Sequence, residues 1–322
     1  MRKFFIIFPI IVVIILALVA CGQEDEPSYE VNMSVFMGPS ALGALDLMAR
    51  SDQNETINSY NFQILGTPDQ VPPLIMQGAV DIAAVPSNMA SILYNNTGGE
   101  VVVLAASTLG LLHIIDTTDT INSIADLAGQ TVFLTGYGAT PHFVANHILA
   151  QNGLEVGVDV FLDFRAEPPE IAALMNQGVA EIAIVPEPFA TTLANQIDNA
   201  RHALDLTHEW NLIEGESSLI MTAIIARREF AENNPQAIEI FLQEYAESVE
   251  FLSQNLTQAA ELAVYYGIIP NEAIATQAIP RTNQVFITGT DLRTQLLGYL
   301  EVLYNELPAF IGGNLPSDNF FY

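Results

Sequence analysis

The stretch QGAVDIAAVP at residues 77–86 returns one hundred residues later as QGVAEIAIVP at residues 177–186. Each copy has a glycine, then a short apolar run, then a proline. Glycine favours the end of a helix, the apolar run is typical of a buried strand, and proline favours the start of the next helix. Matches at Asn95 and Asn195 extend the repeat. The same supersecondary unit is used twice, which predicts two similar lobes and not a solenoid.

Matching elements precede each copy, with strands and helices alternating in the same order. This order indicates an α/β fold with two doubly wound, mostly parallel lobes. Two apolar extended segments, 101–115 and 219–226, predict strands that cross between the lobes. The other predicted elements are strands at 31–37, 61–65, 82–85, 130–134, 160–164 and 182–185 and helices at 41–50, 141–151, 235–254, 256–266 and 291–306.

The predicted lobes are discontinuous in sequence. Lobe 1 comprises residues 30–112 and 222–322, with the C-terminal helices packed back on it, and lobe 2 comprises residues 113–221. In open α/β sheets, ligands bind beyond the carboxyl ends of the strands. Two facing lobes therefore predict a ligand-binding cleft that is lined from both sides.

Residues 1–20 have the form of a secretory signal peptide, with two basic residues before an apolar run from Phe4 to Ala20. A run of this length is also compatible with an uncleaved anchor helix. The tetrapeptide LVAC, which ends at Cys21, resembles the lipobox of bacterial lipoproteins. The resemblance implies a palmitate-type lipid on Cys21, a short tether over residues 21–29, and attachment to the outer face of the cell membrane.

The charge balance argues against several classes of partner and site. The 322 residues include 37 Asp and Glu against 9 Lys and Arg. Two of these basic residues lie in the signal segment, which leaves a net charge of −30 and no lysine in the rest of the chain. Such a surface repels phosphate groups and argues against nucleic-acid binding. The single cysteine excludes an intramolecular disulfide framework.

The five histidines do not have the spacing of a metal site. None forms a His-x-x-x-His or His-Glu-x-x-His pair, and His202 and His208 lie in a polar stretch that is typical of a surface. The sequence therefore predicts no metal and no cofactor.

Four further motifs accompany the repeat: Cys21, DLAGQ at 126–130, REF at 228–230 and NP at 234–235. Together with the repeat they resemble extracytoplasmic solute-binding proteins of ABC importers, in the nitrate, sulfonate and thiamine-precursor group. The resemblance covers residues 29–322. It implies a type II periplasmic-binding-protein fold, a monomer, a small-molecule solute, and an ABC permease with its ATPase as partner. Ligands in that group are anions, alkyl sulfonates or pyrimidines, and the sequence does not decide among them.

The first strand-to-helix turn of each lobe is a candidate for ligand contact. Small residues there let backbone N–H groups approach a ligand, although glycine and proline are expected in any turn. Tyr137 is the strongest candidate, because a large side chain between two glycines has no core to enter. The predicted contacts in these turns are Met37, Gly38, Pro39, Ser40, Thr135, Gly136, Tyr137, Gly138 and Thr140.

The turns after the two repeated strands supply the second set of candidates. Ser87 and Asn88 offer neutral hydrogen bonds, whereas Glu187 offers a charge and Phe189 a ring for stacking. A glutamate is also favoured at a helix start by the helix dipole alone. Arg281 lies between apolar segments, which predicts a specific partner, either a structural carboxylate or the ligand.

These features predict a binding protein that captures a small organic solute between two closing lobes and delivers it to an ABC importer. One alternative is an enzyme on the same fold, with pyrimidine or menaquinone precursor chemistry. Another is a sensory lipoprotein that does not transport. Catalysis needs an activated nucleophile or an acid–base pair, and the mature chain has no lysine and no second cysteine. We therefore predict no catalytic residue.

Overall fold

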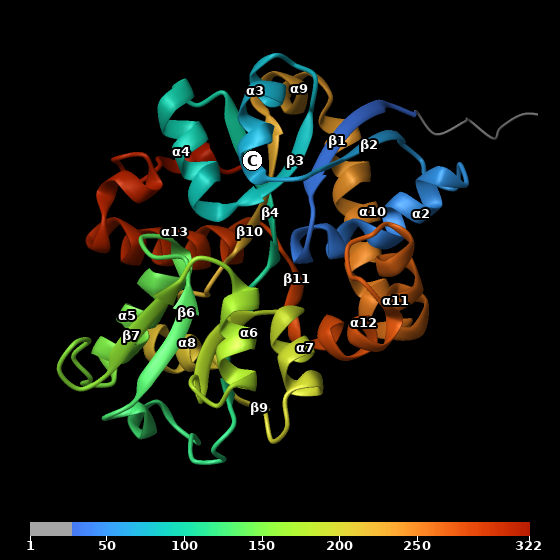
Figure 1. Ribbon diagram of the computed structural model, residues 1–322. Coiled ribbons are helices and arrows are strands. Elements are labelled where there is room, and N and C mark those ends of the chain that lie inside the picture. Colours follow the sequence, from blue (N-terminus) through green and yellow to red (C-terminus); the bar gives the residue numbers. More distant parts are fainter. Residues whose placement is uncertain (1–27) are drawn as a thin grey trace, which may run out of the picture.

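The computed structural model describes residues 28–322, which form two sheets flanked by helices (Figure 1). The predicted signal peptide and Cys21 lie outside the described residues. The strand order in the sheet of lobe 1 is β11 (Gln284–Ile287), β4 (Val101–Thr108), β10 (Thr222–Arg227), β3 (Ile82–Pro86), β1 (Glu30–Phe36) and β2 (Ser59–Leu65). The order in the sheet of lobe 2 is β7 (Phe161–Arg165), β6 (Thr131–Thr135), β8 (Ile182–Pro186), β5 (Leu112–Asp116) and β9 (Arg201–Asp205). The predicted two-lobed α/β fold is confirmed.

Each sheet contains an antiparallel strand that comes from a crossing segment. β1 pairs in parallel with β2 and β3, and β6 pairs in parallel with β7 and β8. β10 lies antiparallel between β3 and β4, and β5 lies antiparallel between β8 and β9. Because β5 follows β4 and β10 returns from lobe 2, each lobe completes its sheet with chain that arrives from the other lobe. The sequence predicts the crossings, but not their antiparallel positions inside the sheets.

Both copies of the repeat fold as helix, strand and helix, with α3 (Val71–Met76) and α4 (Ser87–Thr97) around β3, and α6 (Pro168–Asn176) and α7 (Phe189–Gln196) around β8. Gly78 and Gly178 follow the first helix of each copy, with φ angles of 69° and 68°. This left-handed conformation favours glycine and ends the helix. The repeated unit predicted from the sequence is confirmed in both lobes.

The repeated strands are buried on both faces. Ile82 and Ala84 belong to the core that contains α2 (Leu45–Asp52) and α10 (Pro235–Gln254), whereas Ala83 and Val85 belong to a second core. Burial on both faces explains why the strand is continuously apolar instead of alternating.

The C-terminal helices cover one face of the sheet in lobe 1. α10 packs against α2, and α11 (Leu256–Tyr265) packs against α2 and α12 (Glu272–Ala278). These helices therefore contact an element from the first part of the chain. No helix within residues 28–322 is long and apolar enough to cross a membrane.

The last long helix, α13 (Gly289–Glu306), lies between the lobes (Figure 1). It contacts β4 and the short helix η5 (Pro308–Ile311), which also contacts α4. Trp210, the only tryptophan, is buried on α8 (Leu206–Glu214), and its ring lies 5.6 Å from that of Tyr299 of α13. The C-terminal region therefore contacts lobe 2 as well as lobe 1.

The prediction of a polar surface stretch around His202 and His208 is wrong for His202. Residues 201–214 form β9 and α8, and the side chain of His202 is only 19% exposed, whereas His208 is exposed. The segment has buried positions at Leu206 and Trp210, whose side chains pack into the core that also contains α13. The sequence of a half-buried edge strand that contains a histidine therefore looks like that of an exposed segment.

Candidate ligand-binding site

The first turn of lobe 1 connects β1 to the short helix η1 (Pro39–Ala44). Met37 is 45% exposed, and Gly38 has a φ of 111°. Ser40 is buried, and its hydroxyl donates to the carbonyl four residues earlier at 2.9 Å. The Pro39 carbonyl accepts a hydrogen bond from Gln284 of β11 at 3.1 Å. Met37 is therefore the side chain of this turn that is most available to a ligand.

The turn after β3 forms hydrogen bonds with later parts of the chain. Ser87 donates its N–H to the carbonyl of Met221 at 3.0 Å and its hydroxyl to that of Ile220 at 2.5 Å. Asn88 donates its side-chain amide to the carbonyl of Phe310 in η5 at 3.2 Å. Ser87 is buried and fully used within the fold, whereas Asn88 is half-buried.

The equivalent turn after β8 contains a buried carboxylate. Glu187 donates its N–H to the carbonyl of Leu111 at 2.9 Å. Its carboxylate accepts the N–H and hydroxyl of Thr191 at 3.1 and 3.0 Å, and lies 2.9 Å from Nε2 of His202. Phe189 is half-buried and packs against the core of lobe 2 that includes α6 and α7. Glu187 is therefore engaged by protein groups on several sides.

The first turn of lobe 2 exposes an aromatic ring. Tyr137 is 76% exposed and lies between Gly136 and Gly138, whose φ angles are 82° and 72°. Its ring stacks on His142 at a centroid distance of 5.0 Å and meets the edge of Phe164 at 5.1 Å. The Gly138 N–H donates to Nδ1 of His142 at 3.1 Å. The turn thus holds Tyr137 against two rings while most of its side chain stays in solvent.

These aromatic side chains continue toward lobe 1. Phe143 lies 5.6 Å from His142 and 4.8 Å from Phe310, measured between ring centroids. Phe310 is also the residue whose carbonyl binds Asn88. A chain of contacts therefore joins the predicted site of lobe 2 to that of lobe 1. We call the following residues the aromatic cluster: Tyr137, His142, Phe143, Phe164 and Phe310.

The remaining predicted contacts differ in their surroundings. Thr135 ends β6 and Thr140 begins α5 (Thr140–Gln151), and both are half-buried. Arg281 is exposed, and its guanidinium donates to the carbonyl of Gln277 at 2.5 Å. Its partner is thus a backbone carbonyl, where the sequence predicts a carboxylate or the ligand. Arg281 lies on the C-terminal segment between α12 and β11.

A buried histidine lies next to Glu187 and His202, and the sequence gives no signal for this group. His113 of β5 has its Nε2 3.2 Å from the carbonyl of Arg281, and its ring lies 5.3 Å from that of His202. Burial lowers the pKa of His113, while the carboxylates of Asp205 and Glu187 act in the opposite direction. The three side chains come from β5, the turn after β8, and β9, so no local spacing reveals them.

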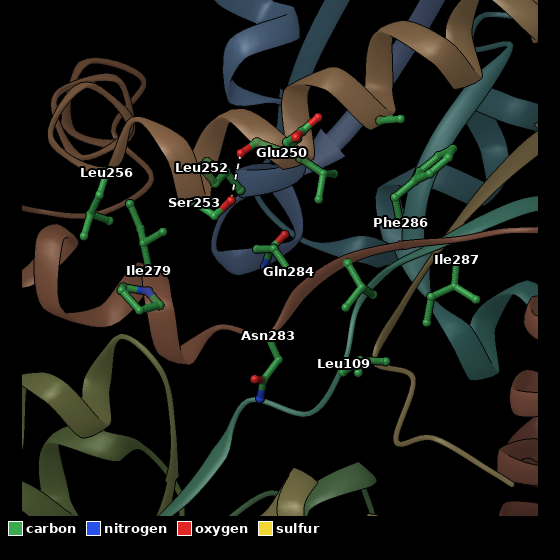
Figure 2. A pocket seen from close by; sticks show the side chains of 14 residues that line it. Leu109, Glu250, Leu252, Ser253, Leu256, Ile279, Asn283, Gln284, Phe286 and Ile287 are labelled. Atoms are coloured by element: carbon green, nitrogen blue, oxygen red, sulfur yellow. Dashed lines mark hydrogen bonds between the residues drawn. The ribbon is translucent and has the colours of Figure 1, made fainter.

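A cavity of about 850 Å³ lies beside the first crossing rather than at the aromatic cluster (Figure 2). Glu250 and Ser253 of α10 lie on one wall, and Leu109 and Asn283 lie on the opposite wall. Asn283 donates to the carbonyl of Gly110 at 2.8 Å, which ties this wall to the crossing. None of the residues predicted as ligand contacts lines the cavity. Its apolar lining includes Leu252, Leu256, Ile279, Phe286 and Ile287.

The aromatic cluster offers stacking surfaces and hydrogen bonds to a ligand. Within residues 28–322, no group of three or more His, Cys, Asp or Glu side chains is arranged to hold a metal ion. The sequence singles out Tyr137 but misses His142, Phe143, Phe164 and Phe310. Phe164 ends a predicted strand, which could have marked it as a strand-end residue, whereas the position of Phe310 depends on how the C-terminal segment packs.

Comparison with known proteins places the chain in a family. Residues 54–276 match the family model described as menaquinone biosynthesis. The chain belongs to this family. Among curated proteins, none matches this sequence.

Solved structures share the fold of this family member. An ABC transporter protein from Parabacteroides distasonis has a TM-score of 0.76 and 20% identity, over 91% of this chain and 98% of that chain. The periplasmic aliphatic sulphonate binding protein SsuA from Escherichia coli has a TM-score of 0.68 and 14% identity, over 89% and 92%. The periplasmic nitrate-binding protein NrtA from Synechocystis has a TM-score of 0.54 and 14% identity, over 90% and 83%. The predicted resemblance to two-lobed solute-binding proteins is confirmed at the level of the fold.

Proposed function

We propose that this member of the menaquinone-biosynthesis family is a solute-binding protein that delivers a small organic solute to an ABC importer. The observation that carries the proposal is the exposed ring of Tyr137, which a chain of aromatic contacts connects to the Asn88 turn of lobe 1. A solute on this ring would lie at the carboxyl ends of the strands, where open α/β sheets bind ligands. The fold shared with importer proteins supports the same function.

Closure of the lobes would complete the site. Lobe 1 in this proposal comprises residues 30–112 and 222–322, and lobe 2 comprises residues 113–221. The first crossing passes through Leu109 and Gly110, and the second through the segment between α8 and β10. A solute that contacts both lobes only when they are closed shifts the population to the closed state by its differential affinity.

A ligand screen tests the site. Solutes that raise the melting temperature are titrated by calorimetry into wild type, Tyr137→Ala and Asn88→Ala. Loss of an aromatic anchor weakens binding by about thirtyfold, since such residues contribute about 2 kcal/mol or more. Tyr265→Ala is the matched control, because Tyr265 is also 76% exposed but lies on α11. Dissociation constants of Tyr137→Ala and Asn88→Ala that both stay within about twofold of wild type would place the solute elsewhere.

The cavity beside the first crossing is the competing location. Ala246 lines it on α10, and Ala246→Phe would fill part of its volume. We expect this substitution to leave the affinity for the solute within about twofold, because a site at the aromatic cluster does not use this wall. A large loss of affinity in Ala246→Phe, with Tyr137→Ala unaffected, would assign the solute to the cavity.

Lipid attachment at Cys21 would keep the protein at the outer face of the membrane. Each buried methylene of an acyl chain contributes about 0.8 kcal/mol to membrane binding. Wild type expressed in a bacterium is expected to label with palmitate and to partition into membranes, and Cys21→Ala is expected to do neither. Equal labelling of the two proteins would contradict the proposal.

The family match makes an enzyme the second candidate function, because its description is a biosynthetic pathway. The buried Glu187 and His113 and the half-buried His202 are the acid–base groups near the strand ends. Mass spectrometry of the solute after prolonged incubation separates the two functions. A solute-binding protein returns the solute unchanged, whereas an enzyme converts it. Uptake of the solute by cells with and without the protein then separates transport from sensing.

A further inference from the structure

The arginine side chains of residues 28–322 already bind other groups of the protein. Residues 28–322 contain seven arginines and no lysine. Six of the arginines form ion pairs with carboxylates, and the guanidinium of Arg281 binds a backbone carbonyl. The ion pairs are Arg50 with Asp46 and Glu247, Arg165 with Asp163, Arg201 with Asp116 and Asp119, Arg227 with Asp81 and Glu229, Arg228 with Glu232, and Arg293 with Asp318.

Arg165 is the arginine nearest in sequence to the aromatic cluster, but it faces away from it. It follows Phe164 in β7, and successive side chains of a strand point to opposite faces of the sheet. Its guanidinium lies 2.7 Å from Asp163 and 5.5 Å from the ring centroid of Phe133. Phe133 belongs to the core with α6 and α7, whereas Phe164 packs against the core with α13. Arg165 is therefore not placed to bind an anion at Tyr137.

Three backbone N–H groups in and after the Tyr137 turn donate to protein acceptors. The N–H of Gly138 donates to His142, that of Ala139 donates to the carbonyl of Gly136, and that of His142 donates to the carbonyl of Ala139. Because Nδ1 of His142 accepts a hydrogen bond, the neutral ring carries its proton on Nε2. Burial lowers the pKa of His142, which favours this neutral form. The turn thus presents rings and a neutral donor.

We infer that the site takes a solute recognised through a flat ring without an anionic group, and not an organic anion of the sulfonate type. This inference rests on the proposed function and specifies the class of its solute. The ring would stack on Tyr137, with Phe164 and His142 beside it and the Nε2–H of His142 as hydrogen-bond donor. A chain with 37 acidic and 9 basic residues adds a long-range penalty against anions.

Three probes that share one ring test the inference by fluorine NMR: para-fluorobenzyl alcohol, para-fluorobenzenesulfonate and para-fluorobenzylamine. We expect the alcohol and the ammonium form of the amine each to bind at least about tenfold more tightly than the sulfonate, which corresponds to about 1.4 kcal/mol. Tyr137→Ala is expected to weaken the alcohol about tenfold, whereas Tyr265→Ala leaves it unchanged. The measurements are repeated at about 1 M sodium chloride, where long-range repulsion is screened.

The following outcomes of these measurements would contradict the inference. Tighter binding of the sulfonate than of the alcohol or the amine, or equal binding of alcohol and sulfonate at high salt, would show that the site does not reject an anionic group. Absence of binding by all three probes, or binding of the alcohol that Tyr137→Ala leaves intact, would also overturn it. The proposed function is judged separately, because a solute found by the melting screen that depends on Tyr137 and Asn88 supports it whatever the solute's charge.

Discussion

The two copies of the repeat share a backbone but differ in the polar group that follows the proline. Ser87 and Glu187 both donate their N–H to the chain that crosses from the other lobe, at Met221 and Leu111. The Ser87 hydroxyl then binds one carbonyl, whereas the Glu187 carboxylate lies close to a backbone N–H, a hydroxyl and His202. The shared hydrogen bond fixes the lobe to its crossing strand. The side chain determines whether that junction is neutral or charged.

The start of the repeated strand shows the opposite arrangement. Asp81, before β3, is buried and accepts hydrogen bonds from Asn32 and Arg227. Glu181, before β8, is exposed. Each lobe therefore buries one carboxylate of the repeat, lobe 1 at the amino end of its strand and lobe 2 at the carboxyl end. Only lobe 2 has its buried charge on the side where the candidate ligand-binding site lies.

The largest expected effect comes from removing the Glu187 carboxylate. In Glu187→Ala, Thr191 and His202 lose a buried partner, and loss of one member of a buried pair typically costs about 3 kcal/mol. Ser87→Ala at the equivalent position removes one neutral hydrogen bond and should cost about 1 kcal/mol. Urea denaturation measures both free energies of unfolding.

Glu187→Gln separates charge from hydrogen bonding at the same position. The amide oxygen still accepts from Thr191, so we expect a loss between those of Glu187→Ala and Ser87→Ala. Equal destabilisation of Ser87→Ala and Glu187→Ala would mean that the two turns contribute alike and that the comparison has no energetic basis.

The next effect concerns the start of the strands. Asp81→Asn removes the charge that faces Arg227 at 3.0 Å, and we expect a loss of about 2 kcal/mol because the guanidinium remains partly buried without that partner. The matched change Glu181→Gln alters an exposed side chain and should stay within about 0.5 kcal/mol. Thermal and urea unfolding of both variants provide the test, and a larger loss in Glu181→Gln would reverse the assignment of the buried carboxylate.

The sequence predicts the parts of this fold that depend on local pattern. α10 spans residues 235–254 as its apolar spacing indicates, and the repeat marks both glycine-ended helices and both buried strands. The antiparallel placement of β5 and β10 could not be predicted, because an apolar run does not record the direction of its neighbours. β9 and β11 were missed for a related reason, since both are half-buried edge strands without a clear alternation.

In the candidate site, too, the sequence predicts the features that depend on local pattern and misses those that depend on long-range packing. Tyr137 stands out in the sequence because a large ring between two glycines is unusual in a turn, and the structure exposes it. Ser40 and Ser87 are small polar residues in turns, which is typical of ligand contacts. Both are nevertheless buried, and their hydroxyls donate to backbone carbonyls. The contribution of Phe310 depends on contacts between residues more than 150 positions apart, such as Phe143 with Phe310. Composition cannot supply that information.

A third difference between the lobes lies in the antiparallel strands, where His113 of β5 occupies the position of Ala223 of β10. Burial lowers the pKa of His113 below the value near 6.5 that it has in the unfolded chain. Just below that pH the unfolded state binds more protons than the folded state. Stability is therefore greatest above about pH 6.5 and falls as the pH drops toward the folded pKa, by at most about 1.4 kcal/mol per pH unit.

Substitution of His113 measures its share of this pH dependence. His113→Gln keeps a donor for the Arg281 carbonyl, and its free energy of unfolding should vary less than that of wild type between about pH 7.5 and 5.5. The burial of His142 lowers its pKa as well, so part of the dependence remains in the variant. His208→Gln, at an exposed site, should reproduce the wild-type slope. Parallel curves for wild type and His113→Gln would contradict a role for this buried histidine.

The smallest effect is expected at the repeated asparagines, Asn95 and Asn195. In each lobe this residue connects the helix after the repeated strand to the C-terminal region. Asn95 of α4 donates to the carbonyls of Ile311 and Asn314 at 3.0 and 2.7 Å, whereas Asn195 of α7 donates to the exposed side chain of Gln277 at 3.2 Å. We expect Asn95→Ala to cost about 1 kcal/mol and Asn195→Ala to stay within about 0.5 kcal/mol, because the first leaves backbone carbonyls unpaired. Urea denaturation resolves this difference if both variants keep the wild-type slope against denaturant.

The same pair of asparagines should differ in their effect on solute binding. Since Asn95 binds η5, which contains Phe310, Asn95→Ala should also weaken solute binding, while Asn195→Ala should not. Equal stability and equal affinity of the two variants would show that α4 and α7 contact the C-terminal region in the same way despite their different partners.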